Sequence, residues 1–182
     1  MTKIKKIGVL TGGADCSGLN AVVRAVTLTA INKYGCEVIG FKKGYAGLYA
    51  NNYMQLTAEN TAQILNQGGT ILKNSNKDNL FNYAYRDENG NIQHKDVSDV
   101  AVQNLKDLQI DALVVIGGDG TLTSARDFAR KGVRVIGVPK TIDNDVSYAD
   151  ITFGFTTALG VICEAVDRVR TTAFSHDRVQ IL

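Results

Sequence analysis

The sequence contains little proline, little cysteine and almost no net charge. One proline among 182 residues excludes proline-rich linkers, whereas 18 glycines permit many tight backbone positions. Cys16, Cys36 and Cys163 are scattered, and their spacing matches neither a Cys-x-x-Cys pair nor a Cys/His metal site. We therefore expect buried, reduced thiols, as in a reducing compartment.

Charge and hydropathy argue against a nucleic-acid-binding protein and against a membrane protein. Lys and Arg number 20 against 18 Asp and Glu, without the clustering typical of a nucleic-acid-binding surface. No stretch approaches the roughly 20 apolar residues of a membrane span, and the apolar run Ile7–Leu10 is too short for a signal segment. We expect a cytoplasmic protein with no nucleic-acid and no membrane partner.

Short apolar runs alternate with segments of helical period. Strands are predicted at Ile4–Leu10, Glu37–Phe41, Ala112–Ile116, Arg134–Val138 and, at the end, Val179–Leu182. Helices are predicted at Leu19–Ile31, Thr57–Asn66, Val97–Leu108, Leu122–Arg130 and Thr157–Arg170, with Gly44–Gly47 as a loop. This alternation predicts an α/β fold of three layers, with a mostly parallel sheet and helices on both faces. Extended runs around Glu88–Asn91 add a small β-hairpin excursion at about residues 81–95.

Polar, glycine-rich segments follow three of the predicted strands. They are Thr11–Asn20, Gly117–Thr121 and Pro139–Asp145. Ligands of parallel sheets bind beyond the carboxyl ends of the strands, so we expect the three segments to converge on one cleft.

The first two segments suit phosphate chemistry. Glycines let the backbone approach a phosphate, and a helix N-terminus supplies free N–H donors. Thr11–Asn20 is neither a GxGxxG nor a Walker loop, and alone it is equally compatible with a turn that binds nothing. In Gly117–Thr121, Asp119 is suited to Mg²⁺, which prefers carboxylate and phosphate oxygens, or alternatively to capping a helix.

The third segment carries charged and hydroxyl side chains that could act in catalysis. Asp143 and Asp145 lie two residues apart, so one could act as a general base while the other orients substrate or metal. Thr141 offers a hydroxyl for a phosphoryl group, and Lys140 adds a cation. The alternative is a solvated Asx-rich turn.

In this order the segments resemble the phosphofructokinase family, whose members phosphorylate the 1-hydroxyl of fructose 6-phosphate. The resemblance extends from Ile7 to about Arg178. Pro139–Asp145 is specific to the family, whereas NAD kinases and diacylglycerol kinases also carry a motif like Gly117–Thr121. Supporting matches are Gly18–Ala21, Gly44–Tyr45, Gly47–Leu48, Gly68–Thr70, Thr152–Thr157 and Ser175–Arg178.

The resemblance implies a role for each matching residue. Asp143 matches the catalytic base, and Thr141 and Asp145 match contacts to the sugar and the transferred phosphoryl group. Asp119 matches the carboxylate associated with Mg²⁺, the implied cofactor. Arg178 matches an arginine that reaches the sugar phosphate of a neighbouring subunit, and this implies a homo-oligomer. The implied donor-binding residues are Gly13, Lys77, Gly118, Asp119, Gly120, Thr121 and Lys140.

The phosphoryl donor is implied less clearly. Pyrophosphate users of the family tend to carry Asp at the position of Gly120 and Lys at that of Lys140, whereas ATP users have Gly at the first. Since Gly120 leaves room for the α-phosphate, we expect ATP, with pyrophosphate as the alternative. Two departures are Ala14, where a second glycine is usual, and Asn76 with neighbouring Lys77, where Arg is usual.

Family members continue into a second lobe that supplies most sugar-phosphate contacts, and this sequence stops before it. We expect residues 1–182 to form the donor-binding lobe alone, with an exposed apolar patch on the last helix that favours association. Two alternatives stay open at this point. The chain is a catalytically incomplete lobe that binds nucleotide or phosphate, or it is an NAD or lipid kinase that shares only Gly117–Thr121.

Overall fold

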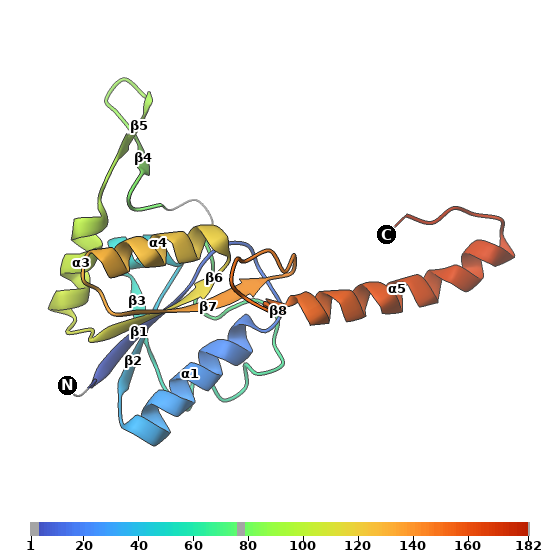
Figure 1. Ribbon diagram of the computed structural model, residues 1–182, viewed down its shortest axis with the longest axis horizontal. Coiled ribbons are helices and arrows are strands. Elements are labelled where there is room, and N and C mark those ends of the chain that lie inside the picture. The colour runs from blue at the N-terminus through green and yellow to red at the C-terminus, as the bar shows by residue number, and fades with distance from the viewer. Residues whose placement is uncertain (1–3, 76–78, 182) are drawn as a thin grey trace.

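The computed structural model shows a three-layer α/β fold (Figure 1). Within residues 4–75 and 79–181, which it describes, six strands form one sheet in the order β3–β2–β1–β6–β7–β8. Strands β2 and β3 pair antiparallel, and the other neighbours pair in parallel, so the predicted sheet is confirmed. The strands are β1 (Lys6–Thr11), β2 (Glu37–Phe41), β3 (Tyr53–Leu56), β6 (Ala112–Gly117), β7 (Val135–Thr141) and β8 (Phe153–Gly154).

Helices cover both faces of the sheet, as predicted. Helix α1 (Leu19–Tyr34) lies on one face, and α2 (Tyr45–Tyr49), α3 (Ser98–Asp107) and α4 (Asp119–Arg130) lie on the other. Neighbouring residues of a strand point to opposite faces. In β1, Val9 therefore packs with the α1 cluster, while Leu10 packs with the cluster beneath α3 and α4. These two cores hold the carboxyl ends of the strands in place.

A two-stranded hairpin projects from the body of the molecule (Figure 1). Strands β4 (Tyr83–Arg86) and β5 (Ile92–Lys95) pair antiparallel, which confirms the predicted excursion. The Asp87 carboxylate closes the turn by accepting hydrogen bonds from the amides of Asn89 and Asn91, both at 2.9 Å. These bonds lower the pKa of Asp87.

Two predictions for the middle of the chain are wrong. The segment Gly44–Gly47, expected to be a loop, contributes to α2, because Tyr45 and Leu48 are buried against the sheet. Residues 57–66 form turns instead of a helix. The capping hydrogen bonds at Thr57 and Asn60 do form, but one capped turn is not enough to propagate a helix. The antiparallel edge strand β3 was not expected.

The last helix, α5 (Phe155–Ser175), extends away from the sheet (Figure 1) and has no buried residue. Its apolar side chains Leu159, Ile162 and Val166 are exposed, as expected for this helix. The strand expected at Val179–Leu182 is wrong for the described residues 179–181, which have no regular structure. Within residues 4–75 and 79–181, no helix is both long and apolar enough to cross a membrane.

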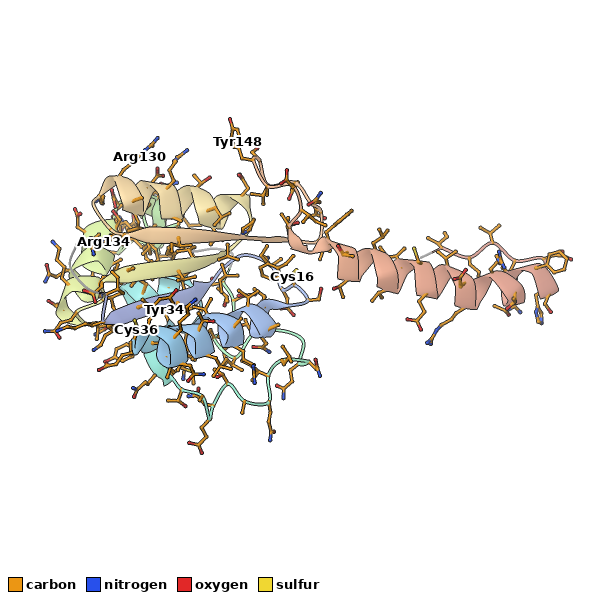
Figure 2. The ribbon with its side chains drawn as sticks, turned by 60° about the horizontal axis from the view of Figure 1, so that its bottom comes forward. Cys16, Tyr34, Cys36, Arg130, Arg134 and Tyr148 are labelled. Carbon is orange, nitrogen blue, oxygen red and sulfur yellow. The ribbon has the colours of Figure 1, made fainter. Side chains whose placement is uncertain are left out.

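The cysteines are free, and two of the three are buried as expected. Figure 2 places Cys36 beside Tyr34 at one end of α1 and Cys16 towards the other end. Cys163 lies on α5 and is exposed, so the expected burial is wrong for this residue. Its exposure agrees with the rest of α5, in which no residue is buried.

Candidate active site

The three polar segments meet at one edge of the sheet, around a cavity of about 370 Å³. Its walls come from the loop after β1, the first turn of α4 and the end of β7, as the parallel topology requires. The predicted residues Gly13, Gly118, Asp119, Gly120, Thr121, Lys140, Thr141 and Asp145 all line it. Tyr45, Ser75, Asn79 and Ser124 also line the cavity and were not predicted.

The loop after β1 packs closely against α4. Gly13 has a φ of 82°, a conformation that favours glycine, whereas Ala14 does not have a positive φ and is unstrained in this respect. The Gly13 amide donates to the Ser75 carbonyl at 3.1 Å. Gly13 therefore contributes space beside the Lys140 ammonium, because its own N–H is already used.

The motif Gly117–Thr121 forms the start of α4. Gly118 precedes the helix in an extended conformation, and the first helical hydrogen bond runs from the Leu122 amide to the Gly118 carbonyl at 3.0 Å. The amides of Asp119, Gly120 and Thr121 therefore have no partner within the helix and direct partial positive charge to the cavity. Asp119 and Gly120 are exposed, and the space around Gly120 is open.

Thr121 fixes this turn in position. A Cβ atom at Gly12 would lie 2.8 Å from the Thr121 side chain, and one at Gly117 would lie 2.5 Å from it. Without side chains at Gly12 and Gly117, the first turn of α4 can pack closely against the loop after β1 and the end of β6. From the other side, the buried Tyr45 hydroxyl donates to the Thr121 carbonyl at 2.9 Å. Burial raises the pKa of Tyr45, which keeps this hydroxyl protonated as a donor.

The Gly117→Ala variant is expected to lose about 1–3 kcal/mol of stability, because the added methyl group overlaps Thr121. Displacing Thr121 also shifts the first turn of α4, which lines the cavity. The loss of stability is measured by urea denaturation. Gly120→Ala is the matched control, since open space surrounds that position. Equal stability of the two variants would contradict the packing argument.

Lys140 is the buried cation of the cavity. It is 4% exposed, and its ammonium donates to the Ala14 carbonyl at 2.6 Å. Among the residues that the structure describes, no carboxylate forms an ion pair with it. A buried ammonium that has only a neutral partner is strongly suited to an anionic ligand.

Thr141 and Asp143 are linked to each other. The Asp143 amide donates to the Thr141 hydroxyl oxygen at 3.0 Å, and that hydroxyl lies 3.3 Å from the Asp143 carboxylate as its donor. Thr141 lines the cavity, whereas Asp143 is exposed and does not. The Asp143 carboxylate is therefore one hydrogen bond away from the cavity wall.

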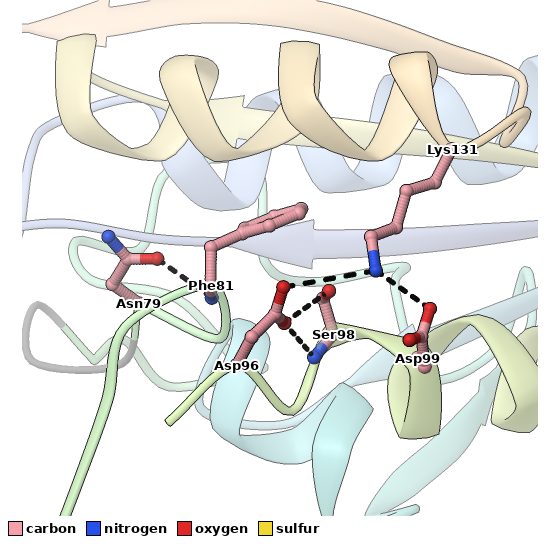
Figure 3. Close-up of polar contacts among 6 residues, drawn as sticks. All are labelled: Asn79, Phe81, Asp96, Ser98, Asp99 and Lys131. Carbon is pink, nitrogen blue, oxygen red and sulfur yellow. Dashed lines mark hydrogen bonds and ion pairs between the residues drawn. The ribbon is translucent and has the colours of Figure 1, made fainter. Parts of the chain in front are cut away.

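A polar cluster at the base of the hairpin supports another wall (Figure 3). Asn79 lines the cavity, and its side chain accepts the Phe81 amide at 3.0 Å. The Phe81 ring packs on Phe128 of α4, and the Lys131 ammonium lies 5.7 Å from its centroid. Lys131 also pairs with Asp99 at 2.7 Å, and this bond raises its pKa. The cluster joins the segment beside the cavity to α3 and α4.

One predicted site residue, Lys77, lies outside the described residues. Another, Arg178, is not among the residues that line the cavity. Arg178 follows α5, and the end of that helix lies away from the sheet (Figure 1). Arg178 thus does not join the other site residues within one chain.

Two carboxylates at the cavity are available to bind a cation. Among residues 4–75 and 79–181, no group of three or more His, Cys, Asp and Glu side chains lies together. Asp119 and Asp145 line the cavity. Such a site fits Mg²⁺, which takes one or two protein carboxylates and completes its shell with phosphate and water oxygens.

Comparison with known proteins identifies the family. The family model described as phosphofructokinase matches residues 6–182. The chain belongs to the phosphofructokinase family. It is 65% identical over its full length to an ATP-dependent 6-phosphofructokinase 2 of Clostridium perfringens, and 49% identical over 97% of its length to one of Streptomyces coelicolor. The alternative of an NAD or lipid kinase is therefore excluded.

Solved phosphofructokinases share the fold as well. The Pichia pastoris phosphofructokinase in the T-state matches 93% of this chain with a TM-score of 0.78 and 33% identity. The chain covers 18% of that protein, and 50% and 48% of the two bacterial relatives. It thus spans about half the length of the curated phosphofructokinases that it matches.

Proposed function

We propose that the chain contributes the donor-binding and proton-accepting residues of an ATP-dependent 6-phosphofructokinase. The reaction transfers the γ-phosphoryl group of ATP to the 1-hydroxyl of fructose 6-phosphate. One observation carries the proposal: the buried ammonium of Lys140 and the first turn of α4 face the same cavity as Thr141, which is bonded to Asp143. An anion-binding wall and a candidate base therefore lie side by side.

The residues divide the work as phosphoryl transfer requires. Asp143 accepts the proton of the 1-hydroxyl as the bond from that oxygen to the γ-phosphorus forms and the bond to the bridging oxygen of ADP breaks. Lys140 and the α4 amides stabilise the negative charge on the phosphoryl oxygens. Thr141 orients Asp143 and contacts the transferred group, while Asp145 lies beside them to orient the sugar.

Asp119 is the residue proposed to hold Mg²⁺, with Asp145 as the second carboxylate of the cavity. When bound, Mg²⁺ neutralises charge on the donor phosphates. Asp119 is exposed in the first turn of α4, where a carboxylate is also favoured by the helix dipole.

The open space at Gly120 supports ATP as the donor. Apart from its chain neighbours and the backbone of α4 itself, no atom lies within 4 Å of a Cβ built there, so the cavity can extend past the β- and γ-phosphates. Lys140 adds charge that either donor can use. Relatives of this chain that are named ATP-dependent support the same choice.

The Gly120→Asp variant is expected to bind ATP·Mg about tenfold more weakly and pyrophosphate·Mg with a smaller loss. The added carboxylate occupies the space assigned to the α-phosphate and repels it, at a cost of about 1.4 kcal/mol. Calorimetric titration with both donors measures the difference. The Gly120→Ala variant separates volume from charge, and an equal loss for both donors would contradict the assignment.

Turnover and donor binding test the proposal together. Purified chain is mixed with fructose 6-phosphate and ATP·Mg, and fructose 1,6-bisphosphate is measured by a coupled assay beside calorimetric titration of ATP·Mg. Binding with turnover is the expected result. Binding without turnover favours a catalytically incomplete lobe, a second candidate supported by Arg178, which is not among the residues that line the cavity. If neither ATP·Mg nor pyrophosphate·Mg binds, both the proposed function and the incomplete-lobe alternative are overturned.

We also propose that the enzyme is cytoplasmic and that copies of the chain associate with one another. Besides exposed α5, an apolar cavity of about 560 Å³ lies on the α1 side of β6 and β7, where Ile136 is exposed. Such surfaces favour association. Sedimentation velocity is expected to show a concentration-dependent oligomer, and Ile162→Glu should weaken it. Thr172→Glu, on the same exposed helix, is the control; a monomer at all concentrations would contradict the proposal.

A further inference from the structure

The catalytic loop is tied down by a residue that lies outside the motif. Residues 142–152 leave the sheet at the end of β7 and return at β8, which pairs with β7 through Lys140 and Phe153. Within this loop Thr152 is 1% exposed. A hydroxyl so deeply buried needs a polar partner.

Thr152 has partners on both sides of Asp143. Its hydroxyl donates to the Thr141 carbonyl at 2.8 Å, and its amide donates to the Asn144 side-chain oxygen at 2.8 Å. The Thr152 hydroxyl and the Asn144 side-chain oxygen are also 3.3 Å apart. Because a hydroxyl has one proton, the shorter contact to Thr141 is its donated bond, and the amide holds Asn144.

Asn144 shapes the loop through its backbone as well. Its φ is 53°, in the left-handed region that asparagine tolerates better than most residues. The side chain is half-buried, does not line the cavity and is already bonded to Thr152. Asn144 is therefore placed to fix the loop and not to contact the donor.

Asp143 depends on this arrangement because its own side chain is exposed. Its carboxylate accepts a hydrogen bond from the hydroxyl of Thr141, whose carbonyl is itself fixed by Thr152. We infer that Thr152 and Asn144 are positioning residues, which hold the backbone on each side of Asp143 so that its carboxylate meets the sugar hydroxyl. The inference rests on the proposed function of Asp143.

Thr152→Val tests the hydroxyl with almost no change of shape. The full 182-residue chain should show kcat reduced about 10- to 100-fold, because a misplacement of about 1 Å can cost that much. The affinity for ATP·Mg should be unchanged, since Lys140 and α4 are untouched. Thr152→Ser should restore kcat, and Thr157→Val, on exposed α5, should equal the wild type.

A second pair of variants tests Asn144. Asn144→Gly keeps the left-handed backbone accessible but removes the acceptor, and it should lower kcat. Asn144→Asp retains an oxygen acceptor for the Thr152 amide and should retain more activity. Hydrogen exchange at the Thr152 amide should be faster in Asn144→Gly than in Asn144→Asp. Wild-type kcat in both Thr152→Val and Asn144→Gly would overturn the inference while leaving the proposed function intact.

The two proposals fail in different ways. If the wild type produces no fructose 1,6-bisphosphate, the proposed function of the chain alone fails. Hydrogen exchange then tests whether Thr152 and Asn144 position the loop. Faster exchange of the Asp143 and Thr152 amides in Thr152→Val and Asn144→Gly would support the positioning role. Unchanged exchange in both variants would overturn it.

Discussion

Replacing Asp143 with asparagine is expected to lower turnover by about 10²- to 10⁴-fold, the usual contribution of a general base. The amide has almost the same shape and can still accept the hydrogen bond from Thr141, but it cannot take the proton of the sugar hydroxyl. Affinity for ATP·Mg should stay within about twofold, because Asp143 does not line the cavity. The coupled assay and calorimetric titration measure the two quantities.

The control for this variant lies on the same loop. Asp150→Asn removes an exposed carboxylate of equal charge that does not line the cavity, and it should leave kcat unchanged. Near-normal turnover in Asp143→Asn would remove the residue from the mechanism. A large loss in Asp150→Asn would show that net loop charge, and not proton transfer, governs the rate.

Replacing Lys140 with methionine is expected to raise the dissociation constant of ATP·Mg about 10- to 100-fold. Hydrogen bonds to charged groups contribute about 1.5–3 kcal/mol, and this lysine is the buried cation of the cavity. Methionine fills the same volume, but the Ala14 carbonyl loses its partner. Pyrophosphate·Mg should be affected at least as strongly, since it has no nucleoside contacts to compensate.

The matched variant is Lys106→Met, which removes an exposed lysine from α3, outside the cavity lining. Donor affinity should not change there. Unaltered affinity in Lys140→Met would mean that the lysine holds the Ala14 loop and does not contact phosphate. Urea denaturation of both variants separates loss of folding from loss of binding.

Much of the sheet could be predicted because its central strands are short apolar runs that end in glycine. Val9, Leu10, Leu113 and Ile116 are fully buried, so hydrophobicity alone located β1 and β6. The end of β7 was missed because Pro139 lacks an N–H and suggested a strand end. In the structure Pro139 pairs with Gly117, the last residue of β6, and the ladder then continues to β8.

The candidate site could be predicted in outline but not in full. Glycines and carboxylates at strand ends gave Asp119, Lys140, Thr141 and Asp145, which all line the cavity. Tyr45 was missed as a cavity residue, because its position depends on packing against Phe128 of α4, 5.5 Å away between ring centroids. The support that Thr152 gives to Thr141 also depends on tertiary hydrogen bonding, which no local pattern specifies.

Helix α5 has a thermodynamic consequence. With no buried residue, it receives little tertiary stabilisation, and its hydrogen bonds depend mainly on helix propensity. Most helical stability in proteins comes from the packing of one face, so a helix without such packing melts gradually by fraying from its ends. The ellipticity of the chain should therefore decline on mild warming, well before the two cores around the sheet unfold cooperatively.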